Sequence, residues 1–254
     1  MAGTSIVARC GDLQCTPEST IPAFESAIAK GADVIECDVH LTKDGDLVVH
    51  HDYYLGRTDD GSGYISDFTL PELQALDAGG WFGDQFVGTQ MPALEDVLAL
   101  GRGRVRFEID MRTPTLRFLK RLIGAIIRFD VMRDVELTSA HLPLLFQTRR
   151  IDANLRTGVF FSSRPDWMTP VLGQQHVVGW MRLMEAQVAH LPVERIDGAF
   201  VWRLHESGFS VHGSNLSDKE DMRYAIQLGV DQFSTDRLDI ALQVRDELSQ
   251  EEAK

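Results

Sequence analysis

The chain has 254 residues, of which 44% are hydrophobic and 25% charged, and its 38 acidic and 25 basic residues give a formal net charge of −13. This length suffices for one α/β barrel, and the composition excludes a disordered or fibrous chain. A strongly acidic surface repels nucleic acids and anionic lipid headgroups, so we expect neither as a partner. An anionic substrate would therefore need a bound metal or a few well-placed arginines.

The sequence contains no signal for a membrane or secreted protein. No apolar run approaches the roughly 18 residues of a membrane span, and residues 1–11 lack the basic start and long apolar stretch of a signal peptide. Cys10, Cys15 and Cys37 form no Cys-x-x-Cys pair, which argues against a disulfide framework or a structural zinc site. We therefore expect a cytoplasmic protein with no integral membrane segment. The sequence gives no oligomeric state.

Short β-branched runs alternate with amphipathic stretches in the first fifty residues. Pro22 falls at the start of the first predicted helix, where its missing N–H costs nothing. A Lys-Asp-Gly turn at 43–45 separates two strands. The predicted elements are strands at 5–8, 33–39 and 46–50 and a helix at 21–30.

Residues 52–90 are rich in glycine and aromatic side chains and show no clear period. This stretch is too long for an ordinary connection, so we expect a folded insertion or lid within a single domain that covers 1–254. Trp81 and Phe82 are expected to form the small core of the insertion.

The alternation then resumes to the end of the chain. It predicts helices at 93–100, 115–128, 143–150, 167–172, 197–206, 219–228 and 238–250, and strands at 105–109, 135–138, 156–160, 186–190, 209–212 and 231–233. About eight strands in βα alternation favour a TIM (β/α)8 barrel over an open doubly wound sheet, and no G-x-G-x-x-G follows the first strand.

Carboxylates gather where the carboxyl ends of the strands are expected to meet. Glu36 and Asp38 are two apart on one strand, so they point to the same face, and Glu108 and Asp110 repeat this arrangement. His51 closes a further strand. Acidic groups on one inward face need a positive partner, and a hard divalent cation with oxygen ligands is the simplest one.

A set of motifs in fixed order carries a family resemblance. Pro-Glu-Ser-Thr at 17–20 leads to Gly-Ala-Asp-Val-Ile-Glu-Cys-Asp-Val at 31–39, and Val-Val-His-His-Asp at 48–52 follows. Leu-Gly-Arg-Thr at 55–58 and the late run 228–236 complete the set. Together these motifs resemble those of the glycerophosphodiester phosphodiesterase family.

The resemblance implies a metal-dependent barrel that hydrolyses small phosphodiesters of glycerol with Mg²⁺ or Ca²⁺, with Mn²⁺ as a further candidate. Glu36, Asp38 and Glu108 match the family's metal ligands, and His51 matches one of its two acid–base histidines. An imidazole that titrates near neutrality suits proton transfer beside a metal-bound phosphate. The remaining residues expected to contact substrate are Arg9, Arg57, His212 and Asn215.

Four departures from the family pattern bear on activity. Arg9 and Cys10 stand where the family has a catalytic histidine and a phosphate-binding arginine, Asp110 replaces a lysine, and His212 replaces a tryptophan. Arg9 cannot act as the base, because a guanidinium stays protonated, but its fork of donors can bind a phosphate oxygen. Losing one general acid or base typically costs about 10²–10⁴ in rate.

The other histidines receive structural interpretations. His50, His141 and His190 are expected to be partnered and His205 to lie on a helix. Whether His40 or His212 replaces the missing imidazole at the mouth stays open.

Three functions remain in competition. The first is a phosphodiester hydrolase with altered acid–base machinery. The second is a non-catalytic family member that binds a metal or a phosphorylated ligand. The third is a lyase that expels an alcohol by internal attack on phosphorus.

Overall fold

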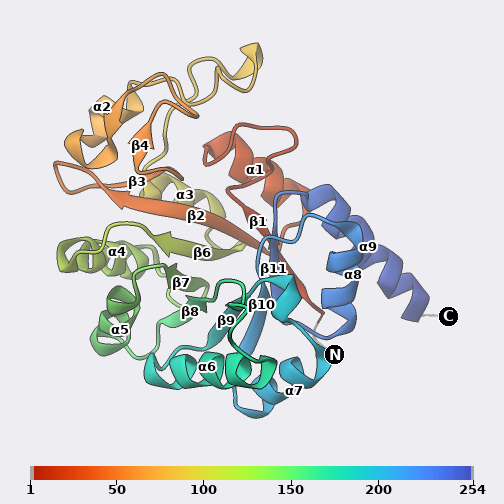
Figure 1. The fold of residues 1–254 in the computed structure, drawn as a ribbon. Helices are drawn as coiled ribbons and strands as arrows, with labels where there is room; N and C mark the ends of the chain where they lie inside the picture. The colour runs from red at the N-terminus through yellow and green to blue at the C-terminus, as the bar shows by residue number, and fades with distance from the viewer. Residues whose placement is uncertain (1–2, 253–254) are drawn as a thin grey trace.

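The computed structural model describes residues 3–252, and it confirms the predicted barrel. Eight strands pair in parallel, and the first closes on the last (Figure 1). Both faces of these strands are covered, so nearly all of their residues are buried, including the charged residues of β2, β6 and β7 that point into the barrel. In ring order they are β1 (Ser5–Arg9), β2 (Val34–Leu41), β6 (Arg106–Met111), β7 (Val135–Ser139), β8 (Arg156–Phe160), β9 (Val188–Leu191), β10 (Ser210–Gly213) and β11 (Gln232–Thr235).

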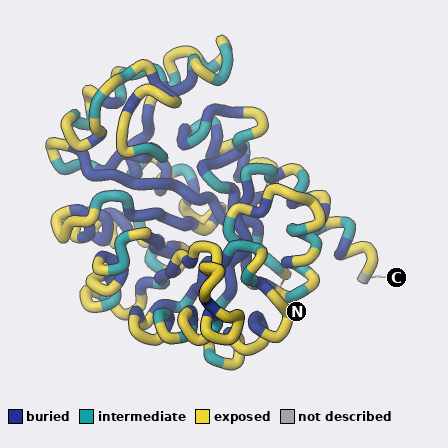
Figure 2. The backbone as a smooth tube through the Cα atoms, viewed as in Figure 1, coloured by how far each residue is buried: buried dark blue, intermediate teal, exposed yellow. Residues whose placement is uncertain are grey.

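Helices follow the strands and form the outer layer, with yellow exposed faces outside and dark blue strands inside (Figure 2). Several begin at a residue whose side chain accepts from the first turn, as Thr20 accepts from the N–H of Ala23 and Thr115 from that of Phe118. The helices are α1 (Ile21–Lys30), α3 (Leu94–Gly101), α4 (Leu116–Phe129), α5 (Leu142–Ile151), α6 (Pro170–Leu183), α7 (Gly198–Glu206), α8 (Lys219–Gln227) and α9 (Leu238–Glu252).

One predicted helix is wrong in its bounds. The helix expected at 167–172 begins later and runs through α6, because Thr169 caps it and Pro170 occupies its first turn. Its buried positions Val177 and Met181 are four apart and continue the apolar stripe beyond the expected end.

Strand β2 is longer than its barrel neighbours. Its first half pairs with β1, while its last residues, Val39–Leu41, pair antiparallel with β3 (Leu47–Val49). All eight residues of β2 are buried. This extension leads the chain into the segment that stands beside the barrel in Figure 1.

That segment contains the short strands β4 (Tyr54–Leu55) and β5 (Gly63–Tyr64) and the helix α2 (Leu70–Gln74). The prediction that Trp81 and Phe82 form its core is wrong, because Trp81 is 47% exposed and neither residue belongs to the buried cluster. Their rings contact each other edge to face, with centroids 5.6 Å apart. The side chains that are buried in this segment are instead aliphatic and pack with Val48 of β3. The buried cluster consists of Val48, Leu55, Ile65, Leu73, Ala78 and Met91.

Candidate active site at the barrel mouth

One register line across five strands consists of charged residues: three glutamates with an arginine at each end. In the parallel pairing, Arg9 lies opposite Glu36, Glu36 opposite Glu108, Glu108 opposite Glu136, and Glu136 opposite Arg156. Because the strands tilt, the line descends from the last residue of β1 at the mouth to the first residue of β8 at the opposite end. The strand register thus places three carboxylates in a row inside the barrel, with an arginine at each end of the row.

A cavity of about 150 Å³ opens at the mouth. Asn215, which follows β10 with a left-handed φ of 54°, lies at its edge beside Ser214 and Ser234. Its backbone N–H donates to the hydroxyl of Ser234 over 2.9 Å. The charged side chains of the lining are Arg9, Glu36, Asp38, Glu108, Asp110 and Arg112.

The carboxylates of the lining are crowded and poorly solvated. Burial, reinforced by Asp38 and Glu108, raises the pKa of Glu36 well above its usual value. Burial raises the pKa of Glu108 to about 8 and that of Asp110 to about 7, although Arg112 opposes the latter shift. Without a bound cation, several of these groups hold protons near neutral pH.

Arg112 is a site residue that the sequence interpretation missed. It is two residues after Asp110 on β6, so the same alternation that pairs Glu108 with Asp110 also directs it to the mouth. Its Nε donates to Asp38 Oδ1 over 2.8 Å, and the same nitrogen lies 3.2 Å from Asp110. Burial works against its charge, but these two carboxylates raise the pKa of Arg112, which stays cationic.

Cys10 lies where the motif predicted a phosphate-binding arginine. Its backbone N–H donates to Glu36 Oε2 over 2.9 Å, and its Sγ lies 3.7 Å from Glu36 and 3.6 Å from Asp38. Burial and both carboxylates raise the pKa of the Cys10 thiol well above its usual value. The sulfur therefore stays protonated, and Cys10 restrains Glu36 through its backbone.

Arg9 and His51 are in direct contact. The Arg9 guanidinium donates to Nε2 of His51 over 3.1 Å, and Nδ1 of His51 lies 2.7 Å from Asp52. Since arginine only donates, Nε2 carries the lone pair and Nδ1 carries the hydrogen. Arg57 bonds to Asp52 and to Glu18 and does not line the cavity. Arg57 thus holds the carboxylate that orients His51.

The structure brings most of the predicted site residues to one place. Arg9, Glu36, Asp38, Glu108 and Asn215 all line the mouth cavity, and His51 touches Arg9 beside it. His212 lies deeper, fully buried in the barrel interior, with Nδ1 3.1 Å from the amide nitrogen of Gln232. It does not line the mouth cavity.

The other histidines lie away from the mouth cavity. His50 Nε2 is 3.1 Å from Asp59, and His205 on α7 is 2.9 Å from Asp231. Burial lowers the pKa of His40 to about 3, and its ring packs edge to face on Tyr53 at 5.1 Å. His141 is 3.3 Å from the hydroxyl of Tyr53.

Two groups of buried side chains in the described part of the chain have ligand atoms close enough to hold a metal ion. One combines Cys10 with Glu36 and Asp38 at the mouth. The other combines Glu108 with Glu136 and two histidines farther inside. Within residues 3–252, the buried oxygens Asp110 Oδ1 and Glu108 Oε2 have no hydrogen-bond partner. Unpartnered carboxylate oxygens that face a cavity fit a hard divalent cation.

None of the described helices combines the length and the apolar character needed to cross a membrane.

The chain is similar to known proteins over most of its length. The chain is 33% identical over 237 residues to a glycerophosphodiester phosphodiesterase of Caldanaerobacter subterraneus subsp. tengcongensis, covering 92% of this chain and 94% of that one. A crystal structure of a glycerophosphodiester phosphodiesterase from Agrobacterium tumefaciens superposes with a TM-score of 0.83 at 25% identity, over 94% of this chain and 99% of that one.

A phosphodiesterase of Oleispira antarctica, solved in complex with the product sn-glycerol-3-phosphate, shares the fold with a TM-score of 0.84 at 21% identity, over 96% and 97% of the two chains. Residues 11–240 match the model of the glycerophosphoryl diester phosphodiesterase family. This match spans almost the whole barrel, so the chain belongs to the glycerophosphoryl diester phosphodiesterase family.

Proposed function

We propose that this protein hydrolyses a small glycerophosphodiester to glycerol phosphate and an alcohol, with a divalent cation bound at the mouth. The observation that carries this proposal is one cavity lined by four carboxylates and two guanidinium groups, in a chain of the glycerophosphoryl diester phosphodiesterase family. The carboxylates suit a cation, and the guanidinium groups suit the two anionic oxygens of a phosphodiester. A cytoplasmic location stays a prediction.

Glu36, Asp38 and Glu108 would hold the cation, which is Mg²⁺, Ca²⁺ or Mn²⁺ in our proposal. When bound, the cation would withdraw negative charge from the phosphate oxygens and stabilise the transition state. Its charge would also keep the crowded carboxylates ionised, replacing the protons that burial otherwise imposes. The hydrogen bond from the Cys10 backbone fixes Glu36 in the direction of the cavity.

Arg9 and Arg112 would bind the phosphate from two sides of the cavity. Arg9 ends β1 and Arg112 extends past the end of β6, so both guanidinium groups are at the rim. Arg112 supplies a cation on the same strand on which Asp110 replaces the family's lysine. Asn215 lies at the same rim and would bind a substrate hydroxyl or phosphate oxygen.

His51 would transfer the proton. Asp52 holds its Nδ1 hydrogen, which leaves Nε2 as the basic atom, and Arg57 and Glu18 hold Asp52 in turn. Nε2 now accepts from Arg9, so rotation of that guanidinium onto a phosphate oxygen would free the lone pair. His212 is too deep to contact substrate in this arrangement, and any effect on the site passes through other residues.

The test is turnover of glycerophosphocholine and of a chromogenic phosphodiester with each of the three cations. Wild type, Glu36→Gln and Arg9→His are compared with Glu25→Gln, which changes an exposed carboxylate on α1 that pairs with Arg104. We expect turnover in wild type and Glu25→Gln and its loss in Glu36→Gln. Inactivity of wild type with every cation would refute the proposal.

A second function is favoured by the contact between Arg9 and His51. If Arg9 stays on Nε2 when a ligand is bound, the base is blocked, and the protein would bind a metal or a phosphorylated ligand without turnover. Wild type would then gain thermal stability with glycerol phosphate and the cation but release no alcohol, and Arg9→His would acquire activity. A cyclic phosphate product would instead identify the lyase reaction.

A further inference from the structure

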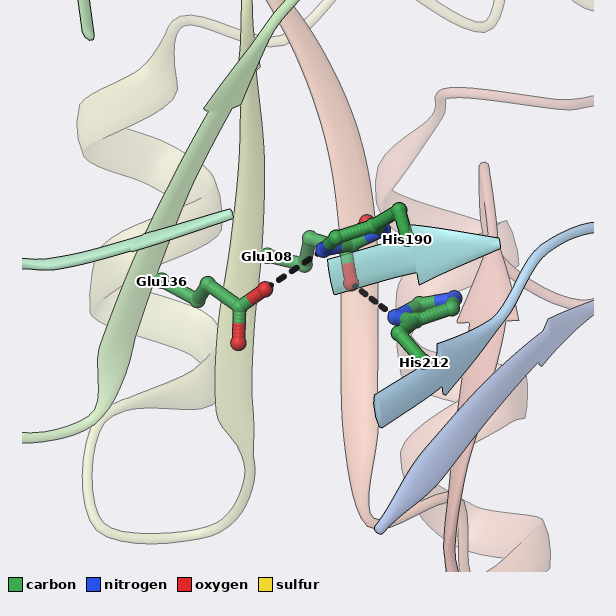
Figure 3. A group of neighbouring side chains, drawn as sticks. All are labelled: Glu108, Glu136, His190 and His212. Carbon is green, nitrogen blue, oxygen red and sulfur yellow. Dashed lines mark hydrogen bonds and ion pairs between the residues drawn. The ribbon is translucent and has the colours of Figure 1, made fainter. Parts of the chain in front are cut away.

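Below the mouth lies a second polar cluster that the proposed reaction does not use in full. Glu108, Glu136, His190 and His212 extend from β6, β7, β9 and β10 toward one another in the barrel interior (Figure 3). Each is at most 5% exposed, and their ligand atoms lie within 4.8 Å of one another. We call these four residues the inner cluster.

Both imidazole rings of the inner cluster face one carboxylate. Nδ1 of His212 lies 3.3 Å from Glu108 Oε2, and Nδ1 of His190 lies 3.8 Å from Glu108 Oε1. The other nitrogen of His190, Nε2, is 2.7 Å from Glu136 Oε1. The two rings stack with their centroids 3.9 Å apart. His190 is thus held from behind by Glu136 and presents its second nitrogen to Glu108.

Three of these atoms are left without partners. Among the residues that the structure describes, Glu108 Oε2, His190 Nδ1 and His212 Nε2 make no hydrogen bond. A buried polar atom without a partner typically costs about 1–3 kcal/mol. One ion between Glu108 and the two rings would satisfy two of these atoms, Glu108 Oε2 and His190 Nδ1.

The backbone makes room for the inner cluster. A Cβ on Gly158 of β8 would lie 2.4 Å from His190 Nε2 and 2.7 Å from Glu136 Oε1, so only glycine fits at this position. A small cavity of about 30 Å³ at the amino end of the barrel reaches Glu108 and Glu136 beside Gln232. Its volume suffices for one ion or water.

We propose that Glu108, His190 and His212 bind a second divalent metal ion, of the kind that accepts imidazole nitrogen, such as Zn²⁺. A carboxylate with two imidazoles is a frequent donor set for Zn²⁺, whereas Mg²⁺ and Ca²⁺ prefer oxygen alone. Glu136 would act as the outer carboxylate that orients a ligating histidine. The separations of 3.3 and 3.8 Å, both measured from Nδ1, suit neighbouring ligands on one ion with bonds of about 2.0–2.2 Å after a small turn of the stacked rings. Ligation through Nδ1 of His212 would replace the hydrogen bond that this nitrogen accepts from the amide of Gln232 over 3.1 Å.

The charge of the cluster supports this assignment. Arg156 donates to Glu136 over 3.1 Å, which leaves Glu108 as the uncompensated carboxylate of the inner cluster. Glu108 would then face both the inner ion and the mouth cavity. Binding of the inner ion does not require that the mouth catalyses hydrolysis.

The test measures zinc directly, on protein without a histidine tag. Metal-free wild type is mixed with equimolar ZnCl₂ in excess Mg²⁺ and desalted, and zinc content and the zinc X-ray absorption spectrum are recorded. His190→Gln and His212→Gln remove inner ligands, and Gly158→Ala fills their space. Glu36→Gln disables only the mouth, and His141→Gln is a matched control outside both sites.

We expect about one zinc per chain in wild type, with imidazole scattering in its spectrum. Zinc should be retained in Glu36→Gln and His141→Gln and fall at least tenfold in the three inner variants. Zinc lost by Glu36→Gln but kept by His212→Gln would place it at the mouth and overturn the proposal. Wild-type protein that retains no zinc, or whose zinc shows oxygen ligands alone, would also overturn it, and neither result requires a variant to fold.

Discussion

Replacement of Glu108 by glutamine is predicted to flatten the pH dependence of stability of the metal-free protein. Glutamine keeps the shape of the side chain but cannot ionise. In the folded wild type, burial raises the pKa of Glu108 to about 8, against an ordinary value of 4.5. The folded protein therefore holds a proton on Glu108 that the unfolded chain has already released.

The sign follows from this proton. The stabilisation due to neutral Glu108 is complete below pH 4.5 and is lost progressively as the pH rises to about 8. Each pH unit corresponds to about 1.4 kcal/mol for one fully bound proton, and Glu108 is half deprotonated at its pKa of about 8, so between pH 6.5 and 8.0 this group alone lowers the free energy of unfolding by about 1.7 kcal/mol. Glu108→Gln should lack this loss. In wild type the charge of Glu108 also raises the pKa of Glu36 and of Asp110. Its removal in Glu108→Gln should therefore reduce their contribution to the pH dependence as well.

Urea unfolding at 25 °C in EDTA and a thiol reductant, at pH 6.5 and 8.0, measures how the free energy of unfolding changes with pH in wild type and in Glu108→Gln. With an m-value of about 2–3 kcal/mol/M, the urea midpoint of wild type should fall by about 0.6–0.9 M more than that of Glu108→Gln between the two pH values. Mn²⁺ in place of EDTA should remove or reverse the loss in wild type, because the cation displaces the proton. Equal slopes in wild type and Glu108→Gln, or a wild type that gains stability toward pH 8.0 in EDTA, would refute the reasoning.

Three further predictions concern the mouth and its surroundings. Arg112→Ala should lower kcat/KM by about 10–10³-fold, since it removes a phosphate-binding charge and leaves Asp38 unpaired; an unchanged kcat/KM in steady-state assays would exclude Arg112 from the site. Gly11→Ala should destabilise the fold by about 2–4 kcal/mol in urea unfolding, because φ is +96° and the new methyl group would meet the backbone of α1; a change under 1 kcal/mol would contradict the close packing. His50→Ala should cost about 3–5 kcal/mol by leaving Oδ2 of buried Asp59 without its imidazole partner, and double replacement with Asp59→Ala should recover part of that loss.

The barrel could be predicted because its evidence is local. Apolar runs that end at glycines and caps identify strands and helices, and a period of two places Glu36 with Asp38 and Glu108 with Asp110. The same period directs Arg112 to the mouth, but its relevance depends on how far β6 extends, and strand ends are poorly marked in a sequence. The helix expected at 167–172 was placed too early and made too short, because Gly173 and Gly179 of α6 weaken the periodic signal.

Depth within the barrel could not be predicted. His212 was expected beside Asn215 at the mouth, yet it lies fully buried and in register with His190. The level that a side chain reaches depends on strand tilt and stagger, which arise from the pairing of all eight strands together. Likewise, Glu136 joins the row of buried carboxylates only because it is in register with Glu108, and no local sequence pattern predicts this.

The pairing of β1 with β11 has a consequence for the way the protein is made. It joins residues near opposite ends of the chain, and the hydroxyl of Thr4 bonds to the carbonyl of Val230, 226 positions away. During synthesis β1 is made before β11, so the edge of β1 that pairs with β11 stays unpaired until the end of the barrel has been made. Contacts of this sequence separation slow folding, and an unpaired strand edge favours aggregation. Arg9, at the end of β1, and Ser234 of β11 line the mouth cavity together only when these two strands are paired. A nascent chain that has not reached β11 therefore holds every carboxylate of the mouth but no complete cavity.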